Sequence, residues 1–379
     1  MKIGVMTFWW SEDNYGQLLQ CYALQKYLRD KGHDAYLIRY DHRKDFTKLS
    51  YWRKILRATN PVWLYKYLLN KKRKIVDKYE KTNNPRKFEE FRSKYLKQTE
   101  RIYYSYNQLV EDPPLADVYI AGSDQIWNTF SLPTKKAINI LNAFFLNFGD
   151  PSIKRISYAA SFGKEKVDND FLKEVSALLR NFDYVSVREK SGLDICKQCG
   201  LDNVEWVPDP TILLDVNIYR ALYREQNIKK QDKPYLFLYL LENDSNFSIK
   251  RIYNWAKNKN IEVVYISGNM QQSNYKKTHP TIPEWIYLLE FAEYVITNSF
   301  HCTVFSLMFS KKFGIIPRAG KNIYANCRFE SIFQLLELEN RFINFNYLNL
   351  DVPIDWQSVS RNYQNIRSKC NLNDIIINL

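Results

Sequence analysis

Short apolar runs alternate with amphipathic segments along most of the chain, and this alternation limits the possible folds more than any other feature. The apolar run at 2–8 is followed by a segment at 16–32 whose apolar residues recur with a helical period, and a second run lies at 34–40. Strands separated by helices at this spacing predict a parallel sheet of Rossmann type. Further strands of this series are expected at 117–122, 154–161, 184–189 and 203–207.

A second series of the same kind begins after the segment "PDPTILLD" at 208–215. Its strands are expected at 234–241, 262–267, 294–297 and 312–318. A length of 379 residues is enough for two domains that each bury a core. We therefore predict an α/β chain of two Rossmann-like domains that face each other across a cleft. They comprise residues 1–212 and 213–330, and a helical segment at 331–379 packs back on both.

Positive charge is concentrated in one stretch of the chain. The net charge is +14, and residues 48–101 hold 17 Lys and Arg against five Asp and Glu. Aromatic side chains, among them Trp52 and Trp63, interleave with the basic ones before a Lys-Lys-Arg-Lys cluster at 71–74. Three interpretations stay open: a solvated helical insertion packed on its own domain, a patch that lies on anionic lipid, and a nucleic-acid site. Because no nucleic-acid-binding motif accompanies the charge, we expect no nucleic-acid partner.

Neither a secretory signal nor a membrane span is visible, because the chain lacks the apolar stretch of a signal and the roughly 18 uninterrupted apolar residues of a span. We therefore expect a cytoplasmic protein. Its six cysteines are expected to be reduced thiols. Cys196 and Cys199 form a C-x-x-C without a second pair at zinc-finger spacing, which favours a coincidence on a helix face over a structural zinc. We expect no metal site.

Small polar residues and a histidine follow the strand expected at 294–297. Asn298, Ser299 and His301 lie between that strand and a helix expected from about 302. Unpaired backbone N–H groups and the helix dipole favour an anion at such a junction, and histidine can donate a proton near neutral pH. A simple helix-capping role for His301 is the alternative.

Other strand ends carry polar residues as well. Ser123 and Asp124 follow one expected strand, where a carboxylate can act as a general base or bind a sugar hydroxyl, although helix capping explains them equally well. Arg188 and Glu189 end another strand, and they form either a surface ion pair or a site at which Arg188 grips a carboxylate or phosphate. The remaining residues that we expect to bind substrate are Asn14 and Gly16 in the N-terminal loop and Arg318 and Lys321 after the last strand.

Six short motifs together resemble one known family. The chain contains, in order, "DNYGQLLQCYALQKYL", "AGSDQIWN", "SYAASFG", "VSVREKSG", "VPDPTILL" and "TNSFHCTVFSLMF". In their order and spacing, these motifs are similar to those of the polysaccharide pyruvyl transferases, over roughly residues 1–340. The resemblance implies a fold similar to the two-Rossmann glycosyltransferases. It also implies transfer of a pyruvyl group from phosphoenolpyruvate to a sugar, as a cyclic ketal across two hydroxyls.

The resemblance implies roles for several residues. His301 matches the family's catalytic histidine, Arg188 its V-R-E arginine and Asp124 its early aspartate. Phosphoenolpyruvate carries a carboxylate and a phosphate and needs a proton on its methylene carbon, which suits a histidine. Asp124 or Glu189 would accept the proton of the attacking sugar hydroxyl. Arg188, with Arg318 or Lys321, would stabilise the departing phosphate, and no cofactor is expected.

One residue departs from the family pattern. Cys302 follows the histidine where a glycine is usual, so it either narrows the donor pocket or packs beneath the loop.

The family's acceptor is often a sugar on a polyprenyl diphosphate or a repeat unit of a surface polysaccharide. The basic and aromatic stretch at 48–101 suits residence at the inner membrane face, so peripheral attachment to anionic lipid is a further expectation. Two alternatives stay open. One is a nucleotide-sugar glycosyltransferase in which Glu290 or Glu293 holds a ribose, and the other is a non-catalytic scaffold of a polysaccharide assembly complex.

Overall fold

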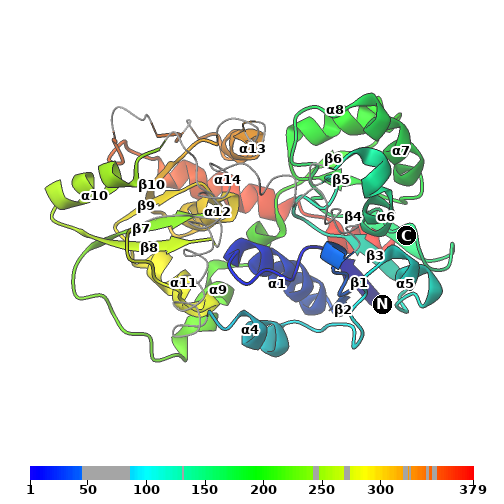
Figure 1. The fold of residues 1–379 in the computed structure, drawn as a ribbon, viewed down its shortest axis with the longest axis horizontal. Coiled ribbons are helices and arrows are strands. Elements are labelled where there is room, and N and C mark those ends of the chain that lie inside the picture. The colour runs from blue at the N-terminus through cyan, green and yellow to red at the C-terminus, as the bar shows by residue number, and fades with distance from the viewer. Residues whose placement is uncertain are drawn as a thin grey trace, which may run out of the picture.

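Two parallel β-sheets lie side by side in the computed structural model, each with helices packed against it (Figure 1). The structure describes residues 1–44, 86–129, 132–241, 247–268, 274–318, 323, 326–338, 341–343 and 348–379. The two sheets belong to the two halves of the chain in which the sequence predicts Rossmann-like domains. The α/β class with two such domains is confirmed.

The N-terminal sheet has the strand order β2-β1-β3-β4, with every neighbouring pair parallel. Its strands are β1 (Lys2–Met6), β2 (Asp34–Leu37), β3 (Val118–Ala121) and β4 (Lys154–Ser157). A parallel pair, β5 (Ser186–Val187) and β6 (Glu205–Trp206), continues beyond β4 through isolated bridges such as Ala160 to Val187. The strands are apolar and buried because helices cover both faces of a parallel sheet. The helices of this half are α1 (Tyr15–Asp30), α4 (Phe88–Tyr95), α5 (Tyr106–Glu111), α6 (Thr134–Phe144), α7 (Asn169–Leu179) and α8 (Lys190–Gln198).

The C-terminal sheet repeats this arrangement with the order β10-β9-β7-β8. Its parallel strands are β7 (Tyr235–Leu240), β8 (Glu262–Ser267), β9 (Tyr294–Thr297) and β10 (Lys312–Ile315). All six residues of β7 are buried, as expected for a central strand. The helices are α9 (Val216–Arg224), α10 (Ile249–Asn258), α11 (Ile282–Glu290), α12 (Phe300–Met308) and α13 (Cys327–Leu335).

In both sheets the strand order switches sides at the first strand. The second strand lies on one side of the first and the third strand on the other, so the loops that follow the first and third strands diverge. Open α/β sheets bind ligands in the crevice beyond the carboxyl ends of the strands at this point. The two crevices, beyond β1 and β3 and beyond β7 and β9, therefore mark the part of each domain where a site is expected.

Helix α1 joins the two domains into one packed unit. The ring of Tyr15 stacks on Trp285 of α11 with 5.3 Å between ring centroids, and its hydroxyl donates to the carbonyl of Pro280 at 2.6 Å. One hydrophobic core contains side chains of α1, α11 and α12, so α1 is buried against both halves. This shared helix holds the two crevices facing each other.

The C-terminal segment crosses back over the molecule. Helix α14 (Trp356–Ser368) runs from one domain to the other in Figure 1, and α15 (Leu372–Ile377) lies beside the N-terminal sheet. Leu372 and Ile376 are buried in one cluster with Ile3 and Val5 of β1. The domain boundary predicted near 212 falls between β6 and α9, in the short 3₁₀ helix η2 (Pro210–Ile212).

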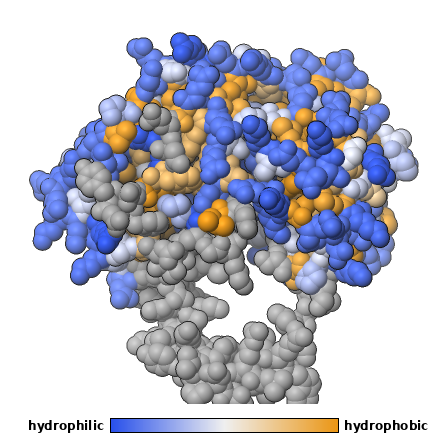
Figure 2. Space-filling view, turned by 90° about the horizontal axis from the view of Figure 1, so that it is seen from above, coloured by the Kyte–Doolittle hydropathy of each residue, from blue (hydrophilic) through white to orange (hydrophobic). Residues whose placement is uncertain are grey.

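Residues 45–85 lie outside the described residues, and with them Trp52, Trp63 and the basic cluster at 71–74. Helix α4 follows this segment and packs Phe88 and Phe91 into the core beside α1. Among the described residues, no helix is both long and apolar enough to cross a membrane. Figure 2 shows mostly hydrophilic side chains on the described part of one face, with hydrophobic ones in scattered patches.

Candidate active site

A pocket of about 460 Å³ lies between the two domains, where the strand ends of both sheets converge. The N-terminal domain contributes Trp10, Asp13, Asn14, Gln17, Asp124 and Gln125 to its lining. The C-terminal domain contributes Leu241, Ser299, Phe300, His301, Arg318 and Arg328. The pocket therefore contains histidine, arginine and carboxylate side chains brought together from distant parts of the sequence.

His301 lies in the first turn of α12, which begins directly after β9. Ser299 caps this helix, and its hydroxyl accepts a hydrogen bond from the backbone of Cys302. Backbone N–H groups at the start of a helix have no acceptor in a preceding turn, so such a position is a general anion-binding feature. The His301 side chain is 5% exposed, which removes it from bulk water while it still lines the pocket.

Gly16 makes the position of His301 possible. A Cβ atom on Gly16 would lie 2.3 Å from Nδ1 of His301, far closer than any van der Waals contact. The first turn of α1 and the imidazole therefore pack directly against each other, and a side chain at residue 16 would push the ring away. Gly16 was predicted to bind substrate, and the structure places it as a positioning residue for the histidine.

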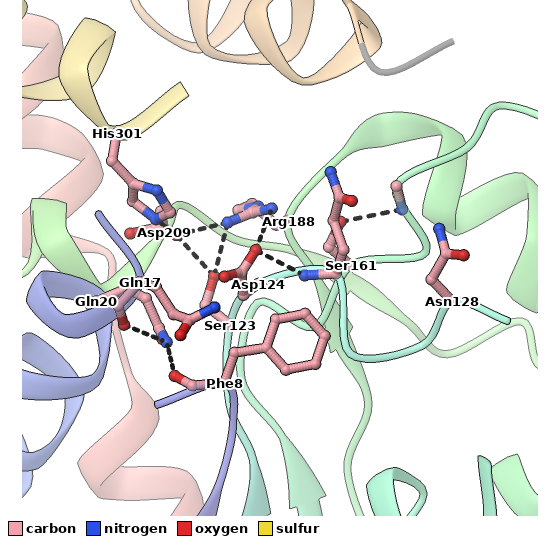
Figure 3. Close-up of polar contacts among 12 residues, drawn as sticks. Phe8, Gln17, Gln20, Ser123, Asp124, Asn128, Ser161, Arg188, Asp209 and His301 are labelled. Carbon is pink, nitrogen blue, oxygen red and sulfur yellow. Dashed lines mark hydrogen bonds and ion pairs between the residues drawn. The ribbon is translucent and has the colours of Figure 1, made fainter. Parts of the chain in front are cut away.

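Asp209 is the nearest carboxylate to His301. Its Oδ2 atom lies 3.3 Å from Nε2 of the imidazole, although the two residues come from opposite domains (Figure 3). Asp209 is 1% exposed, and its other oxygen, Oδ1, accepts hydrogen bonds from the backbone N–H and the hydroxyl of Thr211 at 3.0 and 2.7 Å. The carboxylate is therefore held rigidly against one edge of the ring.

Arg188 and Ser123 also bind Oδ2 of Asp209. The guanidinium donates from Nη1 at 2.9 Å, and the Ser123 hydroxyl donates at 2.7 Å (Figure 3). Burial by itself would raise the pKa of Asp209, but His301, Arg188 and the Ser123 hydroxyl outweigh burial and hold that pKa well below its usual range. Asp209 therefore stays ionised, and its negative charge lies beside the imidazole of His301.

Arg188 lies deeper than the sequence suggests. It is 2% exposed, and its guanidinium carbon lies 4.7 Å from the centre of the Phe300 ring. We expected Arg188 to face the cleft and grip an anion, whereas the structure uses it to hold Asp209 beneath the histidine. Ser123 is fully buried and shares this role.

The two carboxylates predicted as candidate bases are placed very differently. Asp124 lines the pocket, 3.9 Å from Nη2 of Arg188, with a φ of +84° that aspartate rarely adopts. Glu189 is fully buried, and its Oε1 accepts hydrogen bonds from the Ser161 hydroxyl and the backbone of Phe162 and Gly163 at 2.8, 2.9 and 3.1 Å. This placement gives Glu189 a structural role in holding the loop after β4, whereas Asp124 lines the pocket.

The other residues predicted to bind substrate fall into two groups. Asn14 caps α1 by accepting from the backbone of Gln17, and Asn298 accepts from the backbone of Leu241, so both side chains are engaged in loop structure. Arg318 lines the pocket, and its Nη2 lies 3.4 Å from the carbonyl of Asn298. Lys321 lies outside the described residues.

Sequence reasoning missed several charged residues of the site: Asp209 beside the histidine, and Glu12, Asp13, Arg43 and Arg328 in the pocket lining. The sequence does mark Asp209, because a carboxylate between two prolines at a domain boundary is unusual. We interpreted that segment only as the boundary between the two domains. Arg328 begins α13 and has no local signal that we can identify. It is 5% exposed, and with the Gln125 amide turned to accept, the amide oxygen lies 2.7 Å from Nη1 and 3.1 Å from Nη2.

The cysteines that the sequence singled out lie away from the pocket lining. Cys302 lies in the first turn of α12 and is fully buried in the core, so it does not line the pocket. Cys196 and Cys199 lie at the end of α8 in the N-terminal core, and burial raises the pKa of Cys196 to about 12. Within the part of the chain that the structure describes, no group of three or more His, Cys, Asp or Glu side chains is placed to hold a metal ion.

The family relationship follows from the sequence that builds this site. The family model described as polysaccharide pyruvyl transferase matches residues 14–319. The chain belongs to the polysaccharide pyruvyl transferase family. The matched region of this pyruvyl transferase family member contains Gly16, Asp124, Asp209 and His301, whereas Arg328 lies beyond it.

No curated protein matches this family member in sequence. Similar solved structures include UDP-GlcNAc 2-epimerase from Neisseria meningitidis bound to UDP-GlcNAc, at 8% identity over 97% of this chain and 92% of that chain, with a TM-score of 0.44. A putative UDP-N-acetylglucosamine 2-epimerase from Listeria monocytogenes is 9% identical over 97% and 88% of the two chains, with a TM-score of 0.49. An alpha-glucosyltransferase in complex with UDP and DNA is 10% identical over 100% and 99%, with a TM-score of 0.44.

Proposed function

We propose that this protein transfers the enolpyruvyl group of phosphoenolpyruvate to two hydroxyls of a sugar, giving a cyclic pyruvate ketal and inorganic phosphate. Membership of the pyruvyl transferase family supports the class of reaction. The observation that carries the proposal is the buried pair of His301 and Asp209, which lies at a helix start beside arginines in a pocket between two domains.

The pocket suits a substrate with several negative charges. The first turn of α12 offers backbone N–H groups and the positive end of the helix dipole. Arg318 lines the same side of the pocket, with its guanidinium next to the loop that precedes α12. A phosphate bound between them would lie beside His301, and this proximity supports phosphoenolpyruvate as the donor.

The proposed chemistry begins with a proton from the imidazole of His301. That proton adds to the methylene carbon of the enol, whose double-bond electrons form the new C–H bond, and C2 becomes an oxocarbenium-like centre. A sugar hydroxyl attacks C2 and loses its proton to Asp124. The C2–O bond to phosphate then breaks, and the phosphate leaves with the proton held by Asp124. A second hydroxyl attacks C2 to close the ketal and gives its proton to the imidazole of His301, which restores both groups.

Asp209 and Arg188 support the proton transfer without touching substrate. The ionised Asp209 lies against the imidazole and holds its orientation, and Arg188 holds the carboxylate in place. In a buried site these interactions are weakly screened, so they keep the ring in one position for the proton transfer.

We also propose a polyprenyl-diphosphate-linked sugar as the acceptor, at the inner face of a membrane. The support comes from the sequence alone, in which the stretch at 48–101 combines bases with Trp52 and Trp63. Bases near anionic headgroups each contribute about 1 kcal/mol to binding, and aromatic rings suit the interface.

The rival glycosyltransferase function receives less support from the structure. Glu290 ends α11, where it binds Arg220 at 2.8 Å, and Glu293 lies just before β9. Both glutamates are therefore at the amino end of the C-terminal sheet, opposite the strand ends that form the pocket. They are poorly placed to hold the ribose of a nucleotide bound there.

The test is to incubate the purified protein with phosphoenolpyruvate and a set of lipid-linked sugars. We expect release of inorganic phosphate together with an acceptor that gains the mass of one pyruvyl ketal, and no product with His301→Ala. Thermal stabilisation by nucleoside diphosphates but not by phosphoenolpyruvate would favour the glycosyltransferase instead. Turnover that survives in His301→Ala would contradict the proposed mechanism.

A further inference from the structure

Arg328 is a pocket residue to which neither the family match nor the sequence motifs assign a role. It lies in the first turn of α13, in the C-terminal domain, and it lines the pocket at 5% exposure. A charged side chain with so little contact with water is costly unless the site is built to use it.

Contacts from both domains fix the plane of this guanidinium. Gln125, from the N-terminal domain, lies against both terminal nitrogens, and with its side-chain amide turned so that the oxygen faces them, that oxygen lies 2.7 and 3.1 Å away. The ring of Phe300 lies on another side, with the guanidinium carbon of Arg328 6.0 Å from its centre. The guanidinium carbon of Arg188 lies 4.7 Å from the centre of the same ring, so two buried cations contact Phe300.

The surroundings of Arg328 have an excess of positive charge. Burial is the main cause that lowers the pKa of Arg328 to about 9, and repulsion from Arg318 and Arg188 adds to it, while Glu189 and Asp124 act in the opposite direction. Like charges held together out of water are stabilised by an anion that binds among them. The lining therefore favours a ligand with more than one anionic group.

The geometry distinguishes two anionic subsites. Arg318 lies beside the loop that leads into α12, because its Nη2 donates to the carbonyl of Asn298 at 3.4 Å, and a helix start next to a guanidinium suits a phosphate. Arg328 lies beside Gln125 and Phe300 and is influenced by the charge of Asp124, and with the Gln125 amide oxygen turned toward it, both of its terminal nitrogens face that one oxygen. A flat guanidinium matches the two coplanar oxygens of a carboxylate.

We propose that Arg328 binds the carboxylate of the donor substrate and thereby makes the pocket select an enol phosphate that carries a carboxylate over other phosphates. This inference rests on the proposed function, because it names the group of phosphoenolpyruvate that Arg328 recognises. With the carboxylate held by Arg328 and the phosphate at α12, both ends of the donor are fixed. The methylene carbon is then presented to the imidazole of His301 in one orientation.

The test measures binding of phosphoenolpyruvate, inorganic phosphate and glycerol 3-phosphate by titration calorimetry to wild type and Arg328→Gln. We expect the affinity for phosphoenolpyruvate to fall roughly 10- to 100-fold, since a charge-assisted contact is lost, while the affinities for the two other phosphates change by less than about threefold. Arg328→Lys should recover part of the loss, because a point charge replaces the fork. Arg361→Gln, an exposed arginine on α14, serves as the matched control.

A second variant keeps the test decisive if Arg328→Gln does not fold. Gln125→Glu places a carboxylate against the guanidinium, so it should weaken binding of phosphoenolpyruvate and leave binding of inorganic phosphate nearly unchanged. Equal losses for all three ligands in either variant would make Arg328 a phosphate-binding residue and overturn the inference. Unchanged binding of phosphoenolpyruvate by Arg328→Gln would also overturn it. A wild-type protein that fails to bind phosphoenolpyruvate would overturn the proposed function as well.

Discussion

Oδ2 of Asp209 lies 3.3 Å from Nε2 of His301, and the two residues belong to opposite halves of the molecule. The carboxylate comes from the segment that ends the N-terminal domain, and the imidazole comes from the first turn of a helix in the C-terminal domain. The proposed acid and its supporting anion therefore meet only because the two sheets pack with their strand ends facing. Four predictions follow from the pocket and its supporting residues, and a fifth concerns the basic stretch.

Replacement of Asp209 by asparagine should lower kcat by roughly 10² to 10⁴, because a neutral amide keeps the shape but no longer places a negative charge beside the imidazole. The measurement is phosphate release at saturating phosphoenolpyruvate and acceptor. The double variant with His301→Ala should be no slower than His301→Ala alone, since two residues that act as a unit are not additive. Additive losses would contradict the pairing.

The same variant should show a characteristic dependence of stability on pH. Because the charges around Asp209 hold its folded pKa below the unfolded value of about 3.9, the carboxylate adds stability above that value and loses it as pH falls. The wild type should therefore be more stable than Asp209→Asn by a constant amount above about pH 5, and by less below about pH 4. Urea unfolding across this range measures the difference, with the exposed Asp232→Asn as control. A difference that stays flat down to pH 3 would count against the buried ion pair.

Gly16→Ala should lower activity roughly 100-fold without unfolding the protein. A methyl group at residue 16 would overlap the imidazole of His301, and misplacement of a reacting group by about 1 Å can cost that much. Gly32→Ala is a useful contrast, because Gly32 has a φ of +87° and open space around it. That variant should lose stability yet keep kcat, so equal kcat losses in both variants would refute a local effect on the histidine.

Asp124→Asn and Glu189→Gln should separate chemistry from structure. We expect Asp124→Asn to lower kcat by roughly 10² to 10⁴ with little change in the urea midpoint, because Asp124 lines the pocket as the proposed base. Glu189→Gln should instead destabilise the fold by about 1–3 kcal/mol, since Glu189 accepts three hydrogen bonds in the core. The folded fraction of Glu189→Gln should retain most of its kcat. The reverse pattern would make Glu189 the base.

The basic cluster at 71–74 should contribute to binding of anionic membranes. Changing its three lysines and Arg73 to glutamate should reduce co-flotation with liposomes that contain anionic lipid, because attraction to the headgroups becomes repulsion. Neutral liposomes supply the control, on which both forms should float poorly. Equal recovery of the two forms on anionic liposomes would remove the support for membrane attachment.

Local patterns in the sequence predicted most of the secondary structure. The strand expected at 294–297 and the strand at 262–267 have those bounds in the structure, and the helix expected at 16–32 is α1. Errors occur mainly at the ends of strands. The run at 184–189 forms only a two-residue strand, because the residues that follow turn into the site.

The site itself was only partly predictable. Polar residues beyond strand ends are visible in the sequence, so His301, Asp124 and Arg318 were recognised as residues of the cleft. Arg188 and Glu189 have the same local signal, but both are buried beneath the pocket. Their side-chain directions depend on how the short β5 and β6 pair packs beside β4, which no local pattern records.

By itself, the sequence determined the two parallel sheets and the family. Both depend on patterns among residues that are close in the chain: the period of apolar residues in strands and helices, and the short motifs. Only the tertiary structure decided which carboxylate supports the histidine and which arginines line the pocket. The reason is physical. Asp209, Arg328 and Gln125 acquire their roles from contacts across the domain interface, and such contacts depend on the packing of α1 between two sheets rather than on any residue's near neighbours in the chain.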